Sequence, residues 1–441
     1  MENHIIKAVS YFVEHYSCRI FNLSFGDLDK PYNGGHVRAL AAIIDSLSQE
    51  LNILFVISTG NFYGTEEIPE DWLREYPDYL FSPESKILDP APALNALTVG
   101  SLARYDISHQ ASRFPDDVDH QPIARRDQPS PFTRTGPGPL GSIKPEIVEY
   151  GGNLSVSLRR GTDRLNVGHS GLGEVSTALE FAQGRLFGMD SGTSFSAPKI
   201  ANLAGSILQE YPSASANLIR ALIVAHARPT QATLELFNSH PERVLQISGY
   251  GRVDDSLVLA SSERDVTLVA EEEIDGESHH FFEIPLPSDF FNTGRWCRSV
   301  TVALAHSPIV RRTRIKYKGS SMSFKVVRAE SLDKVSEVFR WAKKGEGESM
   351  LKEYEGFYPK AEIRSWGTVQ ASTCEFHQID RRWGTNKLFV VVTHHVETWA
   401  ETIFPREKYA LVVTVRNQST NSVRFYSQIR ERLQVRGRVR F

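Results

Sequence analysis

A short turn that runs into an apolar helix constrains this chain more than any other stretch. Residues 191–198 read Ser-Gly-Thr-Ser-Phe-Ser-Ala-Pro, and the apolar positions that follow recur at helical spacing: Ile200, Leu203, Ala204, Ile207 and Leu208. The pattern predicts a tight turn with Ser194 at a helix N-terminus, where Pro198 fits the first turn. Unpaired backbone N–H groups and the positive end of the helix dipole can stabilise an oxyanion there. Ser and Thr are also common N-cap residues, so an ordinary capped helix is the alternative.

Strands and helices alternate through the first half of the chain. Apolar strands are predicted at 19–26, 53–58 and 96–101, and amphipathic helices at 5–16 and 37–47. This alternation predicts an α/β fold with a parallel sheet and helices on its faces. Ligand sites in such sheets lie beyond the carboxyl ends of the strands, where this sequence has Ser24-Phe25-Gly26 and Gly60-Asn61.

These segments together resemble a known family. The string Gly192-Thr193-Ser194-x-Ser-x-Pro resembles the nucleophile motif of subtilisin-like serine proteases, the subtilases. Residues 22–26 (Asn-Leu-Ser-Phe-Gly) are similar to the strand whose backbone lines the subtilase primary specificity pocket. Residues 58–61 (Ser-Thr-Gly-Asn) resemble the motif whose Asn donates to the oxyanion, although Gly-Asn alone is a common turn.

The resemblance implies a role for each of these residues. Ser194 would be the catalytic nucleophile, and Asn61 together with the Ser194 backbone N–H would hold the oxyanion. Ser24, Phe25 and Gly26 would bind extended substrate backbone. The substrate would be a peptide or protein, and the reaction peptide-bond hydrolysis through an acyl-enzyme on Ser194.

Two further family marks flank the nucleophile. Residues 141–148 (Gly-Ser-Ile-Lys-Pro-Glu-Ile-Val) resemble the Lys-Pro-Asp/Glu-hydrophobic strand that precedes the serine segment in many subtilases. The family usually continues Ala-Pro-Gly, whereas this chain has Glu-Tyr-Gly-Gly at 149–152. Residues 249–254 (Gly-Tyr-Gly-Arg-Val-Asp) match the turn that commonly closes the subtilase core. The five matches occur in order across residues 19–260, a little over half of the chain.

The Asp and the His of a subtilase triad have no counterpart in this sequence. Neither family context occurs, and we assign no catalytic role to the histidines considered: His36, His109, His120 and His169. Without a base the serine hydroxyl is a poor nucleophile, and losing nucleophile or base lowers turnover by about 10⁶. We therefore expect this polypeptide alone to be inactive. The strand at 19–26 is also expected to have an unpaired edge, because the family places the Asp-bearing strand beside it.

Three explanations remain open for the missing residues. The favoured one is that the chain is the C-terminal portion of a full subtilase, since a helix begins almost at Met1. The second is a non-catalytic relative that serves as a peptide-binding or interaction module. The third is a partner chain that supplies the Asp and the His.

The second half of the chain has a different pattern. Alternating and β-branched runs occur at 266–270, 280–284, 299–304, 322–327, 388–393, 409–415 and 423–426, interrupted by a helix with Val335, Val338, Phe339 and Trp341. Short strands separated by loops predict an antiparallel β-sandwich or jelly roll. We therefore predict a partial subtilase-like domain at 1–262 and a β-rich domain at 263–441.

Composition limits the partners and the setting. The net charge of −3 gives no reason to expect nucleic acid or an anionic membrane, and no run of eighteen apolar residues occurs. Three widely spaced cysteines, Cys18, Cys297 and Cys374, argue against a disulfide framework and favour the cytoplasm. No cofactor is expected. The loop at 114–126 matches no metal-site spacing, and calcium, which is frequent in subtilases, has no assignable ligand here.

Overall fold

A computed structural model gives the fold of this chain in two compact units. It describes residues 2–107, 120–157, 165–166, 171–179, 181–238, 240–258, 265–286, 290, 297–341, 352–377, 387–417 and 435–440. The first unit comprises Met1–Ile44, Leu54–Gly205 and Ala227–Val253. The second comprises Asp45–Ile53, Ser206–His226 and Asp254–Phe441. Each unit is described below by itself.

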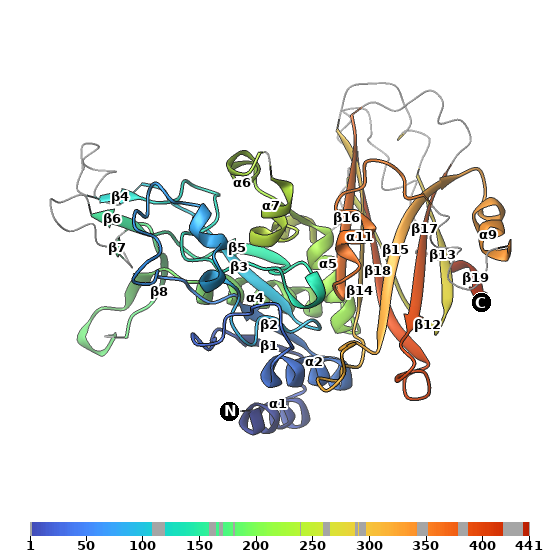
Figure 1. The fold of residues 1–441 in the computed structure, drawn as a ribbon, viewed down its shortest axis with the longest axis horizontal. Coiled ribbons are helices and arrows are strands. Elements are labelled where there is room, and N and C mark those ends of the chain that lie inside the picture. Colours follow the sequence, from blue (N-terminus) through green and yellow to red (C-terminus); the bar gives the residue numbers. More distant parts are fainter. Residues whose placement is uncertain are drawn as a thin grey trace. The chain divides into compact units, whose positions relative to one another are not determined.

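The first unit is built on a six-stranded sheet with the order β1-β2-β3-β5-β11-β10 (Figure 1). Its strands are β1 (Ile20–Leu23), β2 (Leu54–Ser58), β3 (Leu97–Leu102), β5 (Ile147–Tyr150), β11 (Arg252–Val253) and β10 (Ala227–Arg228). All neighbouring strands run parallel except β11 and β10. Every residue of β2 and β3 is buried, as is typical of the central strands of a parallel sheet. The predicted parallel α/β sheet is confirmed.

Helices and smaller strands make up the other elements of the chain up to Val258. The helices are α1 (Glu2–Tyr16), α2 (Ala39–Leu51), α4 (Thr193–Glu210), α5 (Ala216–Ala225), α6 (Gln231–Leu236), α7 (Pro241–Ser248) and α8 (Asp255–Val258). Of these, α5 and α8 belong to the second unit, and α2 and α4 begin in the first unit and end in the second. Two small sheets come from β4 (His120–Pro122), β6 (Ser155–Ser157) and β7 (Leu165–Asn166), and from β8 (Glu174–Thr177) and β9 (Phe187–Asp190).

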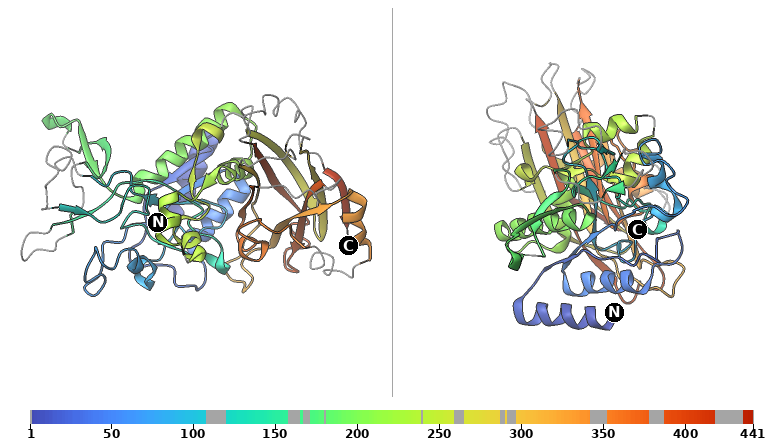
Figure 2. Two further views of the ribbon diagram at one scale, coloured as in Figure 1. Left: turned by 90° about the horizontal axis from the view of Figure 1, so that it is seen from above. Right: turned by 90° about the vertical axis from the view of Figure 1, so that its left-hand side faces the viewer.

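The strand β1 lies at the edge of the six-stranded sheet. Within the described residues it pairs only with β2, and none of its four residues is fully buried. Helix α1, which precedes it, buries only Val9 and exposes Tyr11, Phe12 and Tyr16. Figure 2 shows α1 at the periphery of this unit. The expected unpaired edge is therefore present in the described part of the chain.

A buried ion pair explains the Lys-Pro-Glu sequence before β5. The Lys144 ammonium lies 2.6 Å from the Glu146 carboxylate, and both side chains are almost wholly buried. Lys144 also donates to Thr98 Oγ1 at 3.0 Å, and Glu146 accepts from the Thr98 N–H at 2.8 Å. Burial raises the pKa of Glu146, although Lys144 opposes that shift. The pair therefore ties the start of β5 to β3.

The turn at 249–251 needs its two glycines. Gly249 and Gly251 have φ of +55° and +108°, a region that L side chains rarely adopt. A Cβ atom at Gly251 would lie 1.9 Å from the carbonyl carbon of Arg228, and one at Gly249 would lie 2.1 Å from the Pro145 oxygen. The Val148 N–H donates to the Gly251 oxygen at 3.0 Å. Close backbone approach to β5 thus explains this motif.

The second unit contains a β-sandwich. One sheet has the order β12-β18-β14-β16, and the other has the order β15-β17-β13-β19 (Figure 1). The strands are β12 (Asp265–Asp275), β13 (Ser278–Ile284), β14 (Arg298–His306), β15 (Ser320–Ala329), β16 (Val369–Phe376), β17 (Lys387–Val396), β18 (Arg406–Asn417) and β19 (Val435–Arg440). All of their pairings are antiparallel.

Both sheets contribute to one apolar core, as a sandwich requires. Val302 and Val413 of one sheet belong to the same buried cluster as Phe324 and Val390 of the other. Helix α9 (Leu332–Trp341) covers the opposite face of the second sheet through Val335 and Phe339, which confirms the predicted helix. A short helix, α11 (Ala361–Arg364), precedes β16.

The sequence patterns located most strands within a few residues but missed some elements. The predicted strand at 19–26 ends at Leu23, so Ser24–Gly26 follow the strand. The hairpin of β8 and β9 and the strand β16 were not predicted, and the predicted strand at 423–426 lies outside the described residues.

Candidate active site

The predicted nucleophile lies at the first turn of a helix, as its sequence indicated. Helix α4 begins at Thr193, so Ser194 is its second residue, and its side chain is half-buried. The preceding turn is held against the end of β5, because the Gly192 N–H donates to the Gly151 oxygen at 2.8 Å. Ser191 Oγ donates to the Asn153 oxygen and Ser196 Oγ to the Glu149 oxygen, each at 2.9 Å. The turn is therefore fixed on both sides of Ser194.

Asn61 meets this turn through Thr193. Its side-chain oxygen accepts hydrogen bonds from the Thr193 N–H at 2.9 Å and from the Thr193 hydroxyl at 3.0 Å. A Cβ atom at Gly192 would lie 3.0 Å from Asn61 Nδ2, so the amide nitrogen faces the glycine of the turn. The structure thus brings Asn61, which follows β2, to the N-terminus of α4.

The segment after β1 reaches the same place. The Ser194 hydroxyl donates to the Ser24 backbone oxygen at 3.4 Å, across 170 positions of sequence. Asn22 Nδ2 donates to Ser24 Oγ at 2.9 Å, and the Phe25 side chain is exposed. Ser194, Asn61 and Ser24 therefore converge beyond the carboxyl ends of β1 and β2, where ligands bind in parallel sheets.

Leu88 packs between these two strand ends. A Cβ atom at Gly26 would lie 2.9 Å from Leu88 Cβ, and one at Gly60 would lie 2.6 Å from Leu88 Cδ1. The Leu88 N–H donates to the Thr59 oxygen at 3.2 Å, and its side chain is buried. Gly60 also has φ of +89°. Both this backbone conformation and the contact with Leu88 therefore favour glycine at position 60. Both glycines therefore allow the strand ends to lie close to the Leu88 side chain.

Two residues that support Asn61 and its turn escaped the sequence analysis. The buried Arg134 guanidinium donates to the Asn61 backbone oxygen at 3.0 Å and to the Lys86 backbone oxygen at 2.9 Å. Burial lowers the pKa of Arg134 to about 10. The Tyr63 hydroxyl donates to the Ser191 oxygen at 3.3 Å, and burial, followed by the charge of Asp190, raises its pKa. Neither residue lies in a motif, so only their long-range contacts identify them.

No base adjoins Ser194 within the described residues. The hydrogen bond to the Ser24 oxygen is the single one that its hydroxyl makes there. His36 is exposed, His120 lies in β4, and His109 and His169 lie outside the described residues. In the part of the chain that the structure describes, the arrangement has a serine hydroxyl with an amide on the neighbouring residue, but no proton acceptor that could activate the serine.

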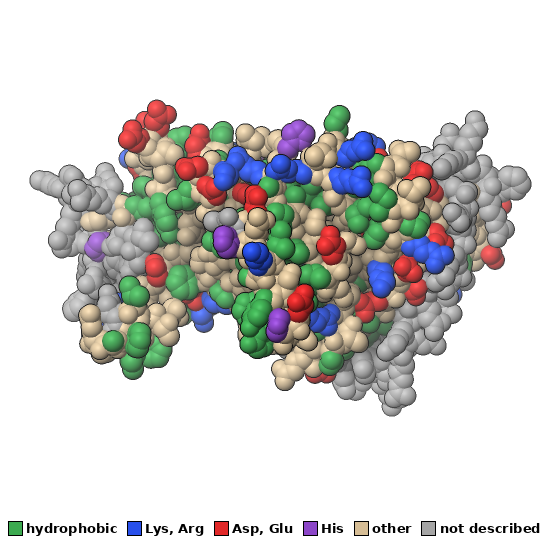
Figure 3. Space-filling model, turned by 90° about the horizontal axis from the view of Figure 1, so that it is seen from below, with side chains coloured by type: hydrophobic (Ala, Val, Ile, Leu, Met, Phe, Trp, Pro, Cys, Tyr) green, Lys and Arg blue, Asp and Glu red, His purple; other side chains and the backbone are tan. Residues whose placement is uncertain are grey.

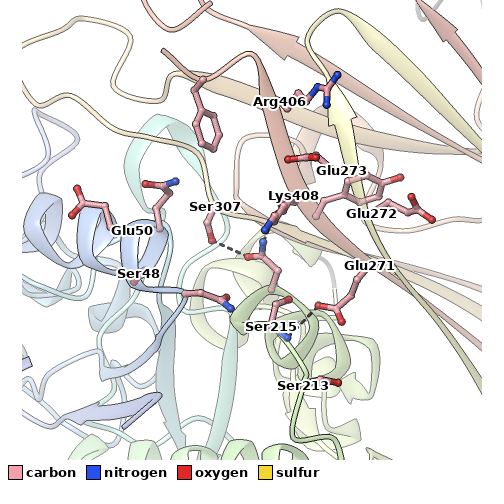
Figure 4. A pocket seen from close by; sticks show the side chains of 15 residues that line it. Ser48, Glu50, Ser213, Ser215, Glu271, Glu272, Glu273, Ser307, Arg406 and Lys408 are labelled. Carbon is pink, nitrogen blue, oxygen red and sulfur yellow. Dashed lines mark hydrogen bonds between the residues drawn. The ribbon is translucent and has the colours of Figure 1, made fainter. Parts of the chain in front are cut away.

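A cavity lies within the second unit, and Ser194, Asn61 and Ser24 are not among its lining residues. It has a volume of about 750 Å³ and is bordered by the end of α2, the start of α5, and the strands β12 and β18 (Figure 4). Glu271 accepts from the Ser215 N–H at 3.1 Å, and Asn217 accepts from the Ser307 hydroxyl at 2.8 Å. Its walls combine four glutamates with Arg406 and Lys408, so charge of both signs lines it and no ligand class is favoured.

Metal-ligand clusters, membrane-spanning helices and disulfide bonds are all absent from the described residues. These residues contain no cluster of three or more His, Cys, Asp or Glu side chains suited to a metal ion. None of their helices is both long enough and apolar enough to span a bilayer. Cys18, Cys297 and Cys374 are free thiols. On the face drawn in Figure 3, Lys and Arg side chains are interspersed with Asp and Glu.

Comparisons with known proteins identify relatives of this chain. The model of the subtilase family, Peptidase_S8, matches residues 1–251. An uncharacterized protein y4bN of Sinorhizobium fredii (strain NBRC 101917 / NGR234) is 35% identical over 447 residues, which cover 98% of this chain and 100% of that protein.

Two solved structures match part of the chain at low identity. MycP1 with the N-terminal propeptide removed is 18% identical and has a TM-score of 0.34, with coverage of 59% of this chain and 67% of MycP1. A structure described as proteases from Pseudoalteromonas arctica PAMC 21717 is 15% identical and has a TM-score of 0.33, with coverage of 54% of this chain and 50% of that one.

Proposed function

Since this chain belongs to the subtilase family, we propose that it is the serine-bearing part of a serine endopeptidase. The observation that carries the proposal is the convergence of Ser194, Asn61 and the Ser24 backbone from three separate segments. A hydroxyl at a helix N-terminus beside a side-chain amide is suited to acyl transfer, because negative charge develops on the carbonyl oxygen during attack.

Each residue has a defined role in the proposed reaction. Ser194 Oγ attacks the scissile carbonyl carbon, and the hydroxyl proton passes to a base. The Ser194 N–H and Asn61 Nδ2 stabilise the oxyanion, the amine leaves with a proton from the base, and water then hydrolyses the acyl-enzyme. The Ser24–Gly26 backbone pairs with the extended substrate. Because the nucleophile, the oxyanion donors and the base in this scheme are all protein groups, we propose that the reaction needs no cofactor, and we assign no calcium ligand.

The base and its orienting carboxylate come from outside residues 1–441 in this proposal. Supporting this, the Ser194 hydroxyl contacts no base and β1 has an open edge, both within the described residues. A strand added at that edge would lie next to Ser24. The source is a further segment of the same protein or a separate partner chain. Alone, the chain is expected to turn over about 10⁶-fold more slowly than a complete site.

The packing of Leu88 against Gly26 and Gly60 suggests which substrate side chains would fit a crevice at this point. Leu88 occupies the space between Gly26 and Gly60. The side chain of the substrate residue that carries the scissile carbonyl would therefore meet the leucine after a short distance. We propose that this residue is small, such as Ala or Ser. The three free cysteines and the net charge of −3 support a reducing, cytoplasmic setting without a nucleic-acid partner.

A non-catalytic peptide-binding module is the second candidate. The observation that favours it is that the Ser194 hydroxyl donates only to the Ser24 oxygen within the described residues. Such a module would retain the substrate strand and the crevice but not the chemistry. It predicts that Ser194→Ala leaves peptide binding unchanged and that no added segment restores hydrolysis.

Labelling with a fluorophosphonate probe distinguishes the two candidates. We expect no labelling of the chain alone, and labelling of Ser194 once any in-frame upstream segment is included or a partner chain is added. Ser194→Ala should abolish that signal, whereas Ser206→Ala, further along α4, should not. Rapid labelling of the chain alone would contradict the external base. No labelling in any form would contradict the nucleophile.

A further inference from the structure

A pocket in the first unit combines apolar walls with a lysine. It has a volume of about 550 Å³ and lies outside the candidate active site. Its walls come from three separate loops, at 32–34, 81–86 and 137–141. The apolar surface is provided by Tyr32, Phe81, Pro83, Pro137 and Leu140, with Lys86 as the single charged residue among the described residues that line it. The pocket therefore offers an open apolar surface and one positive charge.

The Lys86 ammonium has neutral partners within the described residues. It donates to the Gly136 oxygen at 2.7 Å and to Thr135 Oγ1 at 3.2 Å, and it lies 5.9 Å from the centre of the Phe81 ring. None of these groups carries a full negative charge. Burial lowers the pKa of Lys86. An ammonium has three donors, so one N–H remains for a ligand.

The wall at 137–141 has an unusual backbone conformation. Leu140 has φ of +60°, a region that costs a branched side chain energy, and its side chain is 44% exposed. Three backbone hydrogen bonds fix the loop: Gly138 N–H to the Ser142 oxygen, Gly141 N–H to the Gly138 oxygen, and Ser142 N–H to the Pro139 oxygen. The loop therefore presents an apolar leucine at the pocket without needing to rearrange.

We propose that this pocket binds a small apolar monocarboxylate, with the carboxylate on Lys86 and the apolar body between Phe81 and Leu140. Charge complementarity selects the ligand class, because a carboxylate supplies the negative charge that Lys86 lacks. The apolar walls supply the remaining affinity, as in most small-molecule sites. The site is separate from Ser194, so the proposal does not rest on the proposed peptidase function.

Calorimetric titration with two matched ligands tests the site. 4-Phenylbutyrate carries the carboxylate, and 4-phenylbutyramide has nearly the same shape without the charge. We expect saturable binding of the acid, at least about tenfold tighter than that of the amide, since a charge-assisted hydrogen bond contributes about 1.5–3 kcal/mol. Equal affinities for the two ligands, or no saturable binding of the acid, would overturn the proposal.

Two variants separate the roles of charge and wall. Lys86→Met should reduce the affinity for the acid to that for the amide and leave amide binding unchanged. Leu140→Gly retains access to positive φ while removing the side chain, so it should weaken both ligands. Lys7→Met, at an exposed position of α1, is the matched control and should change neither. Acid binding that survives Lys86→Met would contradict the assignment.

Discussion

The side-chain oxygen of Asn61 accepts two hydrogen bonds from Thr193, one from its N–H at 2.9 Å and one from its hydroxyl at 3.0 Å. Because both bonds use the oxygen, the orientation of the amide is fixed and its nitrogen is directed toward Gly192. Thr193 is fully buried, so its N–H has no access to water if the bond is lost. Asn61 therefore has a structural role through its oxygen and, in the proposed reaction, a separate role through its nitrogen.

These two roles predict different effects for two substitutions of Asn61. Asn61→Ala leaves the buried donors of Thr193 without a partner and should lower the free energy of unfolding by about 1–3 kcal/mol. Asn61→Asp keeps an acceptor but removes the amide donor, so it should preserve most of the stability. In the form that fluorophosphonate labels, both variants should slow labelling by about 10²–10³. Urea unfolding and labelling rates check this. Normal labelling of Asn61→Asp would contradict the oxyanion role.

The position of Leu88 predicts a change in preference when the crevice is opened. Leu88→Gly should let the crevice accept a large side chain, because it removes the atoms that face Gly26 and Gly60. We expect binding of acetylated tripeptides that end in Phe to tighten by about tenfold or more, with little change for peptides that end in Ala.

Binding of such product-like peptides needs no catalysis, so calorimetry measures it even in the chain alone. Leu234→Gly, at an exposed position of α6, is the control for a general effect of the substitution. If Leu88→Gly does not change the ratio of affinities for the two peptides, the crevice does not hold the terminal side chain.

The burial of the Lys318 ammonium predicts how the free energy of unfolding depends on pH. Burial lowers the pKa of Lys318 from 10.5 to about 8, although Glu407 and Glu397 oppose the shift. Between these values the unfolded chain binds more protons than the folded one, so stability should increase as the pH rises from about 8 to 10.5. The full contribution is about 3 kcal/mol. Lys318→Met should lack this increase of stability with pH. Guanidinium unfolding of the wild type and the variant at pH 7.5, 9 and 10 measures it. Identical slopes for the wild type and the variant would contradict the assignment.

The buried contacts of Glu407 predict a large loss of stability when its carboxylate is replaced by a neutral amide. It accepts from His306 Nδ1 at 2.8 Å and from His394 Nε2 at 3.0 Å, and all three side chains are buried. Burial alone would raise the pKa of Glu407, but the two histidines hold it well below its usual range. Glu407→Gln should lower the free energy of unfolding by about 3–5 kcal/mol. Glu401→Gln, at an exposed position, should change it little, and an equal effect of both would refute the role of the buried cluster.

The sequence could predict those parts of the site that depend on local pattern. Ser194 lies at the start of α4 because a Gly-Thr-Ser turn and early Pro198 favour a helix N-terminus there. The apolar run before Gly60-Asn61 likewise predicted a buried strand that ends just before Asn61. The Lys-Pro-Glu segment was noted only as a resemblance, and its buried pair with β3 explains why both charges are present.

Other parts of the site depend on contacts that no local pattern encodes. Arg134 donates to the backbone of Asn61, 73 positions away, and nothing in the residues around it predicts that contact. Leu88 reads as one more apolar residue, and its role follows only from two glycines that approach it from different segments. The strand β16 was missed because its small and polar residues, such as Ser372 and Thr373, lack a clear apolar alternation.

By itself, the sequence determined the elements and their order: the turn before Ser194, the parallel strands that end near Ser24 and Asn61, and the β-rich second half. Local propensity and hydrophobic periodicity act over a few residues, so they are visible along the chain. Tertiary structure alone decided that Ser194, Asn61 and Ser24 meet, that Leu88 packs between Gly26 and Gly60, and that Lys86 lines an apolar pocket. Those relationships arise when distant segments pack to bury the core, and packing geometry is a property of the folded chain as a whole.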